Sequence, residues 1–284
     1  MKASTRLRNL LRTQKLIIAP GAFDGLSARL VEQAGFEAIY ASGGAIARAA
    51  GYPDLGLLSF TEITERLATL VDVTSVPIIA DADTGFGGTI QVQRTVRWYE
   101  KLGIAALHIE DQEFPKRCGH LDNKSLISTE EMARKVRAAK AAQQDPDFIV
   151  IARTDAIAVE GLTAALERAA AYREAGADML FIEAPESEGQ IEAIAAYFPD
   201  TPKLINMFHG GKTPVVATAR LESLGYQVVI IPSDLQRAAI YAMQQTLVAI
   251  QKTGNSEAVS QQLTSFKERE RIIDTAAYLA VDVQ

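Results

Sequence analysis

A phrase that recurs four times along the 284-residue chain constrains its fold more than any other feature. The four copies read EQAGFEAIYA, EKLGIAALHIE, REAGADMLFIE and ESLGYQVVII. In each copy a glycine follows a helical segment of mixed polar and apolar residues, at the position where a left-handed backbone ends a helix. These glycines are Gly35, Gly103, Gly176 and Gly225. A near-continuous apolar run follows each of them, which is typical of a parallel strand buried on both faces.

The spacing of these glycines predicts how many strands the chain holds. Gly35 and Gly103 lie 68 residues apart, and Gly103 and Gly176 lie 73 apart, so each interval has room for two strand–helix units of about 35 residues. Filling the intervals gives eight expected strands, which are Lys15–Ala19, Glu37–Ala41, Pro77–Asp81, Ala105–Glu110, Asp147–Ala152, Met179–Glu183, Lys203–Asn206 and Gln227–Ile231. Strands alternating with helices in this number indicate a (β/α)8 barrel or a large doubly wound sheet.

Polar residues at the carboxyl ends of the expected strands favour the barrel. These residues are Ser42, Asp81, Asp83, Glu110, Arg153, Glu183 and Asn206. The strand ends of a barrel meet at one mouth, so these side chains would face each other. A dinucleotide-binding sheet would instead carry a first turn of the form GxGxxG, whereas the first turn here reads APGAFDG. We therefore predict a single α/β domain, a (β/α)8 TIM barrel over residues 1–284, with a helical C-terminal extension over residues 255–284.

Composition and charge narrow the class of partner. The chain has 29 basic and 35 acidic residues, a formal net charge of −6 and no block of five or six like charges, so we expect no nucleic acid and no membrane surface as partner. No apolar run is long enough to span a bilayer. Cys118 is the single cysteine and cannot form an internal disulfide, which fits the reducing cytoplasm. The basic N-terminal segment MKASTRLRNLLRTQK is predicted to be a solvated helix.

Acidic residues from three segments are expected at the barrel mouth. They are Asp81 and Asp83 in IADADTGFGG, Glu110 and Asp111 in LHIEDQ, and Asp54 in GYPDLG. Carboxylate oxygens suit Mg²⁺, or Mn²⁺, rather than zinc. A cation held there would act as a Lewis acid and as a template for an oxygen-rich substrate. For any one of these carboxylates, capping a strand end or pairing with Arg153 is an equal alternative.

The segment KRCGH is the most distinctive motif in the chain. It lies within residues 111–125, which show neither helical nor strand periodicity and are predicted to form a mobile loop over the mouth. Lys116, Arg117 and His120 flank Cys118, and their positive charge is expected to lower the pKa of the thiol and favour the thiolate. Both a nucleophilic and an acid–base role for this cysteine stay open.

Taken together, these motifs resemble those of one enzyme superfamily. The segments that carry the likeness are SGG at 42–44, PDLG at 53–56, DADTGFG at 81–87, HIED at 108–111, KRCGH at 116–120, ARTDA at 152–156 and FIEA at 181–184. From about residue 16 to residue 237 the chain resembles the isocitrate lyase and phosphoenolpyruvate mutase superfamily. Its cysteine loop is similar to that of the carbon–carbon lyases, notably 2-methylisocitrate lyase and 2,3-dimethylmalate lyase. The resemblance implies Mg²⁺ dependence and a homotetramer, a dimer of dimers that exchange their last helix.

The resemblance also implies roles for individual residues. The implied metal set is Asp54, Asp81, Asp83 and Glu110. The implied substrate-binding set is Ser42, Gly43, Gly44, Gly119, His120, Arg153, Glu183, Asn206, Phe208 and Pro232. The implied catalytic set is Cys118, Glu183, Arg153, His120 and Arg117. In this set Cys118 delivers a proton to the cleaved carbon, and His120 and Arg117 tune its thiol.

Two positions bear on the substrate. The tricarboxylate lyases usually place Thr or Ser where this chain has Phe208, and a phenyl ring cannot donate a hydrogen bond to a third carboxylate. The following GGKTP is more similar to the dimethylmalate and alkylmalate lyases, and Pro232 resembles the lyases rather than the oxaloacetate hydrolases.

The expected activity is therefore cleavage of the C2–C3 bond of a 2-hydroxy di- or tricarboxylate. Conversion of 2-methylisocitrate to pyruvate and succinate is placed first. The alternatives are a 2,3-dimethylmalate or 2-alkylmalate lyase and an oxaloacetate hydrolase. A metabolite-binding barrel without catalysis is opposed by the metal set and the cysteine loop.

Overall fold

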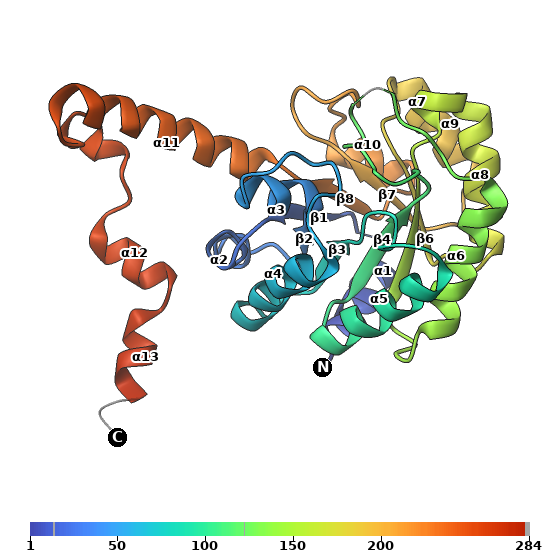
Figure 1. Cartoon of the computed structure of the whole chain (residues 1–284), viewed down its shortest axis with the longest axis horizontal. Coiled ribbons are helices and arrows are strands. Elements are labelled where there is room, and N and C mark those ends of the chain that lie inside the picture. Colours follow the sequence, from blue (N-terminus) through green and yellow to red (C-terminus); the bar gives the residue numbers. More distant parts are fainter. Residues whose placement is uncertain (14, 122, 282–284) are drawn as a thin grey trace.

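The computed structural model describes residues 1–13, 15–121 and 123–281. The strands are β1 (Ile17–Ala22), β2 (Ile39–Ala41), β3 (Ile78–Asp81), β4 (Ala106–Glu110), β5 (Ile149–Thr154), β6 (Met179–Ile182), β7 (Lys203–Asn206) and β8 (Val228–Ile231). They pair in parallel in chain order, and β1 also pairs with β8, which closes the barrel (Figure 1). The predicted α/β barrel is confirmed. The largest shift of a strand is at β1, which begins two residues and ends three residues later than expected.

Helices follow the strands and surround them (Figure 1). They are α1 (Ala3–Arg12), α2 (Gly25–Gln33), α3 (Gly43–Ala49), α4 (Phe60–Val73), α5 (Thr89–Leu102), α6 (Thr129–Ala142), α7 (Ile157–Glu160), α8 (Leu162–Glu174), α9 (Glu188–Tyr197), α10 (Thr218–Ser223), α11 (Asp234–Thr253), the 3-10 helix η1 (Glu257–Gln262), α12 (Phe266–Ile272) and α13 (Thr275–Val281).

The four repeated glycines end helices as predicted. Gly35, Gly103, Gly176 and Gly225 all have positive φ, at 86°, 94°, 106° and 75°. A residue with a Cβ is strained in this conformation, and glycine is not. Each glycine therefore turns the chain from a helix on the outside back toward the next strand.

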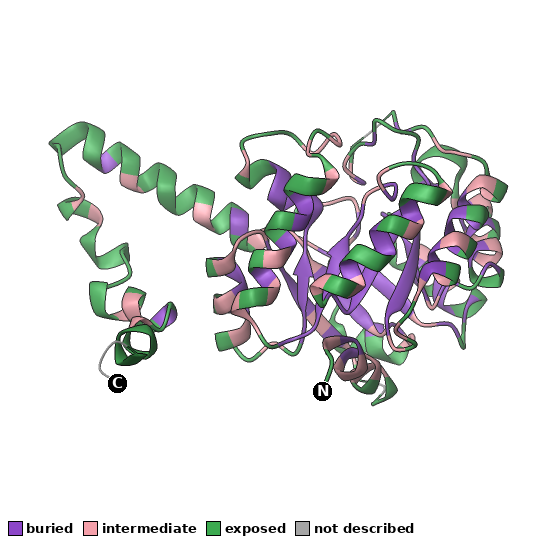
Figure 2. Ribbon diagram, turned by 60° about the horizontal axis from the view of Figure 1, so that its bottom comes forward, coloured by how far each residue is buried: buried purple, intermediate pink, exposed green. Residues whose placement is uncertain are grey.

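The strands separate two buried clusters. On β5, Ile149 and Ile151 belong to the cluster inside the barrel, whereas Val150 and Ala152 belong to the layer between the strands and the helices. Figure 2 shows the buried strands at the centre and the exposed residues on the outer faces of the helices. Because both faces of each strand are buried, the strands are mostly apolar rather than alternating, with polar residues such as Asp81 and Glu110 at their carboxyl ends.

The N-terminal helix is more than a solvated segment, so that part of the prediction is wrong. Leu7 is 1% exposed and packs with the cluster inside the barrel. Arg8 donates from Nε to the carbonyl of Asp147 at 3.1 Å and from Nη2 to Asp178 Oδ1 at 2.7 Å. These acceptors precede β5 and β6, so α1 covers the amino end of the barrel. Its basic residues anchor it there.

The C-terminal extension contains the short helices η1, α12 and α13 as far as Val281, and residues 282–284 lie outside the described residues. Figure 1 shows α11 extending away from the barrel. Several of its apolar side chains are exposed, among them Tyr241, Met243 and Leu247. Helix α12 contacts α2 of the same chain, where Gln33 Nε2 donates to the carbonyl of Ile272 at 2.8 Å. No helix in the described part of the chain is both long and apolar enough to cross a membrane.

Candidate active site

A cavity of about 60 Å³ at the carboxyl ends of the strands collects most of the predicted site residues. The strand ends and the residues next to them contribute Ser42, Gly44, Asp81, Arg153, Glu183 and Asn206. The longer connections contribute Asp54, Cys118, Gly119, His120, Phe208 and Pro232. Side chains that are up to 190 residues apart in the chain therefore share one small space, as the barrel predicts.

Four predicted residues lie outside this lining. Gly43 lies against the Asp81 carboxylate, while Asp83 and Glu110 contact Lys116 and Arg153, respectively. Arg117 is exposed, and Gln112 holds its backbone by two hydrogen bonds. Its role in tuning the thiol stays a prediction. Residue 122 of the predicted 111–125 loop lies outside the described residues, and the mobility of that loop stays a prediction.

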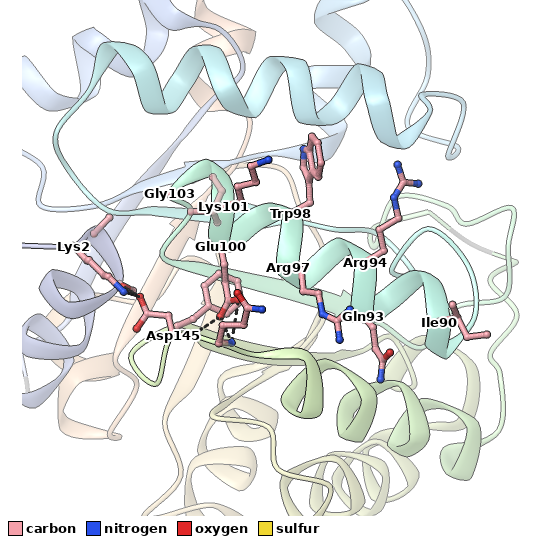
Figure 3. Close-up of a pocket in the computed structure, with 15 residues that line it drawn as sticks. Lys2, Ile90, Gln93, Arg94, Arg97, Trp98, Glu100, Lys101, Gly103 and Asp145 are labelled. Atoms are coloured by element: carbon pink, nitrogen blue, oxygen red, sulfur yellow. Dashed lines mark hydrogen bonds and ion pairs between the residues drawn. The ribbon is translucent and has the colours of Figure 1, made fainter.

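A larger cavity, of about 940 Å³, lies elsewhere. It is a surface groove between α1, α5 and the segment that follows α6, and it contains the ion pair of Lys2 with Asp145 (Figure 3). Trp98 and Arg97 of α5 also line it. None of the predicted site residues reaches this groove, so chemistry rather than size identifies the site.

Lys116 occupies the centre of the predicted acidic set. Its ammonium group contacts Asp54 and lies 2.6 Å from Asp83 Oδ1. The backbone amide of Asp83 donates to Asp81 Oδ1 at 2.9 Å. Burial lowers the pKa of Lys116, but the attraction of Asp54, Asp81, Asp83 and Glu110 outweighs it and holds this pKa well above its ordinary value. A cation is thus stabilised where the four carboxylates converge.

A divalent cation fits the same set of oxygens. Glu110 Oε1 is buried and has no hydrogen-bond partner among the described residues. Glycine at positions 43 and 44 makes room for two of the acids, since an added Cβ would lie 2.7 Å from Asp81 Oδ2 or Asp54 Oδ2. Within the described ranges, no three His, Cys, Asp or Glu side chains are already gathered for a metal. Carboxylate oxygens are nevertheless the ligands that suit Mg²⁺, which is bound through few carboxylates and keeps several of its waters.

The structure contradicts the expected thiolate at Cys118. Burial raises the pKa of this thiol, and Asp54 raises it further. A backbone hydrogen bond from His120 and the charge of Arg153 offset only part of this rise. Lys116, one of the cations expected to lower this pKa, is paired with the carboxylates of Asp54 and Asp83. Cys118 is therefore a protonated thiol at neutral pH.

His120 and Glu183 form a hydrogen-bonded pair beside the cavity. The backbone amide of Lys212 donates to His120 Nδ1 at 3.0 Å, so a neutral ring carries its proton on Nε2. This atom lies 3.1 Å from Glu183 Oε1, to which Asn206 Nδ2 also donates at 3.2 Å. Burial raises the pKa of Glu183, but Arg153 and His120 outweigh it and keep this pKa below its ordinary value. Glu183 is thus an ionised carboxylate.

Arg153 is held by a residue that the sequence did not indicate. Its Nε and Nη2 donate to Asp155 at 2.9 and 3.0 Å, and Nε also lies 3.3 Å from Glu110 Oε2. Its Nη1 lies 3.7 Å from Glu183 Oε2. One edge of the guanidinium is therefore occupied, and the Nη1 side remains for an anion in the cavity. The carboxylate in ARTDA, two residues after the arginine, was the available signal.

The sequence also did not indicate Tyr40, which lines the cavity, or its partner His108. The Tyr40 hydroxyl lies 2.8 Å from His108 Nε2 and 3.4 Å from Asp81 Oδ2. Burial lowers the pKa of His108 to about 3, so this histidine is neutral. Both residues interrupt apolar strands, and a polar side chain in such a run was the signal that could have revealed them.

A family model described as phosphoenolpyruvate phosphomutase matches residues 7–251. The chain belongs to this family. A 2,3-dimethylmalate lyase from Eubacterium barkeri is 43% identical over 269 residues, which are 94% of this chain and 93% of that protein. A 2-methylisocitrate lyase from Bacillus subtilis (strain 168) is 41% identical over 273 residues, 96% of this chain and 89% of that protein. The expected superfamily is confirmed, and these relatives are lyases, as the cysteine loop indicated.

Solved structures of the family share this barrel. A phosphonopyruvate hydrolase in complex with oxalate and Mg²⁺ superposes with a TM-score of 0.91 at 33% identity, covering 100% of this chain and 99% of that one. An oxaloacetate acetylhydrolase in complex with the inhibitor 3,3-difluorooxalacetate gives a TM-score of 0.93 at 34% identity, covering 99% of this chain and 96% of that one. The same barrel thus hosts several reactions, and the substrate has to be argued from the site.

Alkylation of Cys118 by iodoacetamide should show the direction of its pKa shift. Because burial and Asp54 raise the pKa of the thiol, the rate should rise through a midpoint above that of glutathione measured alongside. Mass spectrometry after timed quenching gives the rate at each pH, and only one cysteine can react. A midpoint below that of glutathione would show the thiolate that the neighbouring cations suggest.

Proposed function

We propose that the protein is a Mg²⁺-dependent carbon–carbon lyase that cleaves the C2–C3 bond of a 2-hydroxy carboxylate. The observation that carries this proposal is the pairing of a protonated thiol, Cys118, with an ionised carboxylate, Glu183, on one small cavity. Bond cleavage of this kind needs a base for the hydroxyl proton and an acid for the carbon that leaves. The lyase names of the relatives support the same reaction class.

Each step can be assigned to a residue. Glu183, held by His120, accepts the proton of the C2 hydroxyl. The C2–C3 bonding pair then moves onto C3 and its carboxylate as C2 becomes the carbonyl carbon of a 2-oxo acid. The Nη1 side of Arg153 stabilises the negative charge that develops. Cys118 gives its thiol proton to C3, which completes the second product.

The remaining predicted residues bind and orient the substrate. Mg²⁺ held by Asp54, Asp81, Asp83 and Glu110 would supply Lewis-acid polarisation of the substrate oxygens. Ser42 and the amides of Gly43 and Gly44 would donate to its carboxylate. The small volume of the cavity would limit the water near the carbanion-like product before Cys118 protonates it.

Phe208 favours a dicarboxylate with alkyl substituents, such as 2,3-dimethylmalate. Its ring meets that of His120 edge-on, with centroids 4.6 Å apart. Gly211 supports the ring, since an added Cβ there would lie 3.0 Å from its Cζ. The cavity therefore has an apolar wall where a third carboxylate would need a donor. 2-Methylisocitrate, which the sequence placed first, is the second candidate and is favoured by relatives such as the Bacillus subtilis enzyme.

Product analysis by NMR tests the reaction. The protein is incubated with Mg²⁺ and, separately, with 2,3-dimethylmalate, 2-methylisocitrate and oxaloacetate. We expect propionate and pyruvate from 2,3-dimethylmalate and no turnover in the presence of EDTA. In the Cys118→Ser variant kcat should fall by about 10²- to 10⁴-fold, because the proton donor is removed. Oxalate and acetate from oxaloacetate alone would make the protein a hydrolase, and no turnover of any acid would contradict an enzyme.

Substitution of Phe208 tests the substrate. Phe208→Thr adds a hydrogen-bond donor, and such a bond to a carboxylate changes specificity by about 10- to 100-fold. The ratio of kcat/KM for 2-methylisocitrate to that for 2,3-dimethylmalate should rise by this factor. Phe208→Leu is the control, because it removes the ring without adding a donor. An equal rise in both variants would show that the size of the ring, rather than the missing donor, excludes the tricarboxylate.

We further propose a homotetramer built from dimers that exchange their C-terminal helices. Exposed apolar residues on α11, among them Tyr241, Met243 and Leu247, support it, since large apolar surfaces are normally covered. Light scattering of the full chain should give four times its mass of 30.7 kDa. A monomer at micromolar concentration would contradict the exchange.

The cytoplasmic location stays a prediction.

A further inference from the structure

A buried lysine outside the proposed catalytic groups connects the cysteine loop with the arginine. The ammonium group of Lys124 donates to the carbonyl of Gly119 at 2.5 Å and to Asp155 Oδ1 at 2.8 Å. The side chains of Lys124 and Asp155 are 1% and 0% exposed. Burying an ion pair such as Lys124–Asp155 costs free energy of desolvation, so the pair is weak evidence for a role in stability. Its clearest effect is geometric, because it connects Asp155 with the carbonyl of Gly119.

Gly119 is packed directly against two of the proposed catalytic groups. An added Cβ would lie 2.5 Å from Arg153 Nη2 and 2.7 Å from Glu183 Cγ. The backbone between Cys118 and His120 therefore rests on the arginine and the glutamate without a gap. A shift of the Gly119 carbonyl would move the thiol and the imidazole together.

The other partner of Lys124 is fixed to the barrel. The backbone amide of Asp155 donates to Asp111 Oδ1 at 3.0 Å. Asp111 Oδ2 in turn accepts from Thr154 Oγ1 and from the Tyr172 hydroxyl, both at 2.7 Å. Asp155 also holds the Nε and Nη2 edge of Arg153. The Asp155 carboxylate thus contacts both the arginine and, through the lysine, the loop.

We propose that Lys124 is a positioning residue, which sets the place of Cys118 by tying the Gly119 carbonyl to the Asp155–Arg153 pair. The kinetic part of this proposal rests on the proposed function, in which Cys118 delivers a proton. The geometric part does not, because it concerns only where the thiol lies.

The reactivity of the single thiol tests the geometric part in the absence of substrate. In Lys124→Met the carbonyl of Gly119 loses its anchor, and the reaction of Cys118 with 5,5′-dithiobis(2-nitrobenzoate) should accelerate by about tenfold as the loop opens more often. Lys203→Met is the matched control. It removes another buried ammonium group, which donates to the carbonyls of Phe198 and Thr201 at the opposite end of the barrel. This control should react at the rate of the unmodified protein.

Turnover of 2,3-dimethylmalate, or of whichever of the three acids the protein cleaves, tests the kinetic part. Lys124→Met should lower kcat by about 10- to 100-fold, the effect of a small misplacement of a reacting group, and change KM by less than about threefold. The double variant Cys118→Ser/Lys124→Met should be no slower than Cys118→Ser alone, because Lys124 acts through the thiol.

Several results would overturn the proposal. They are an unchanged thiol rate in Lys124→Met, equal effects of Lys124→Met and Lys203→Met, and independent, multiplicative losses in the double variant. Unfolding of both Lys124→Met and Lys124→Gln at the assay temperature would also overturn it, since it would assign the lysine to stability. Absence of lyase activity in the unmodified protein would contradict the proposed function instead, and the thiol rates would still decide the geometry.

Discussion

The pairing of β1 with β8 is the constraint on which the rest of the structure depends. It aligns Ile17 with Val228 and closes eight parallel strands into a ring. Because all strands run the same way, their carboxyl ends meet at one mouth. Residues as distant as Ser42 and Asn206 thereby line one cavity. An open sheet made from the same strands would leave those ends in a row, and no such site would form.

Concentrating carboxylates at one mouth creates an electrostatic problem that the chain solves with its own cations. Lys116 lies among the predicted metal acids, and Arg153 lies between Asp155 and Glu183. Lys124 supplies the further charge that Asp155 needs. Two of these cations come from the loop that carries the cysteine. Neutralising the acids and placing the thiol are therefore parts of one arrangement, which links the position of the loop to the charge of the site.

Burial and neighbouring charge set opposite protonation states for the two groups proposed to transfer protons. Cys118 lies beside the Asp54 carboxylate and stays a thiol, whereas Glu183 lies between Arg153 and His120 and stays ionised. Two titratable groups whose pKa values are shifted in opposite directions by their surroundings are a common feature of acid–base sites. The pKa of Cys118 is raised, whereas its neighbours in sequence predict that it is lowered. A protonated thiol nevertheless suits a proton donor better than a thiolate would.

The sequence by itself determined the barrel and indicated many of the residues that line its mouth. Glycines such as Gly103 stop helices through local backbone preference, and apolar runs such as β5 reflect burial on both faces, so both signals are readable along the chain. Only the tertiary structure decided the partners and protonation states, because they depend on contacts between distant segments. Lys116 lies two residues before Cys118 in the loop but forms ion pairs with acids on other segments. Lys124 forms an ion pair with Asp155, which lies 31 residues away in the sequence. A charged side chain pairs with the charged groups that the closed barrel brings close to it. Its partner and its protonation state therefore depend on the fold rather than on the local motif.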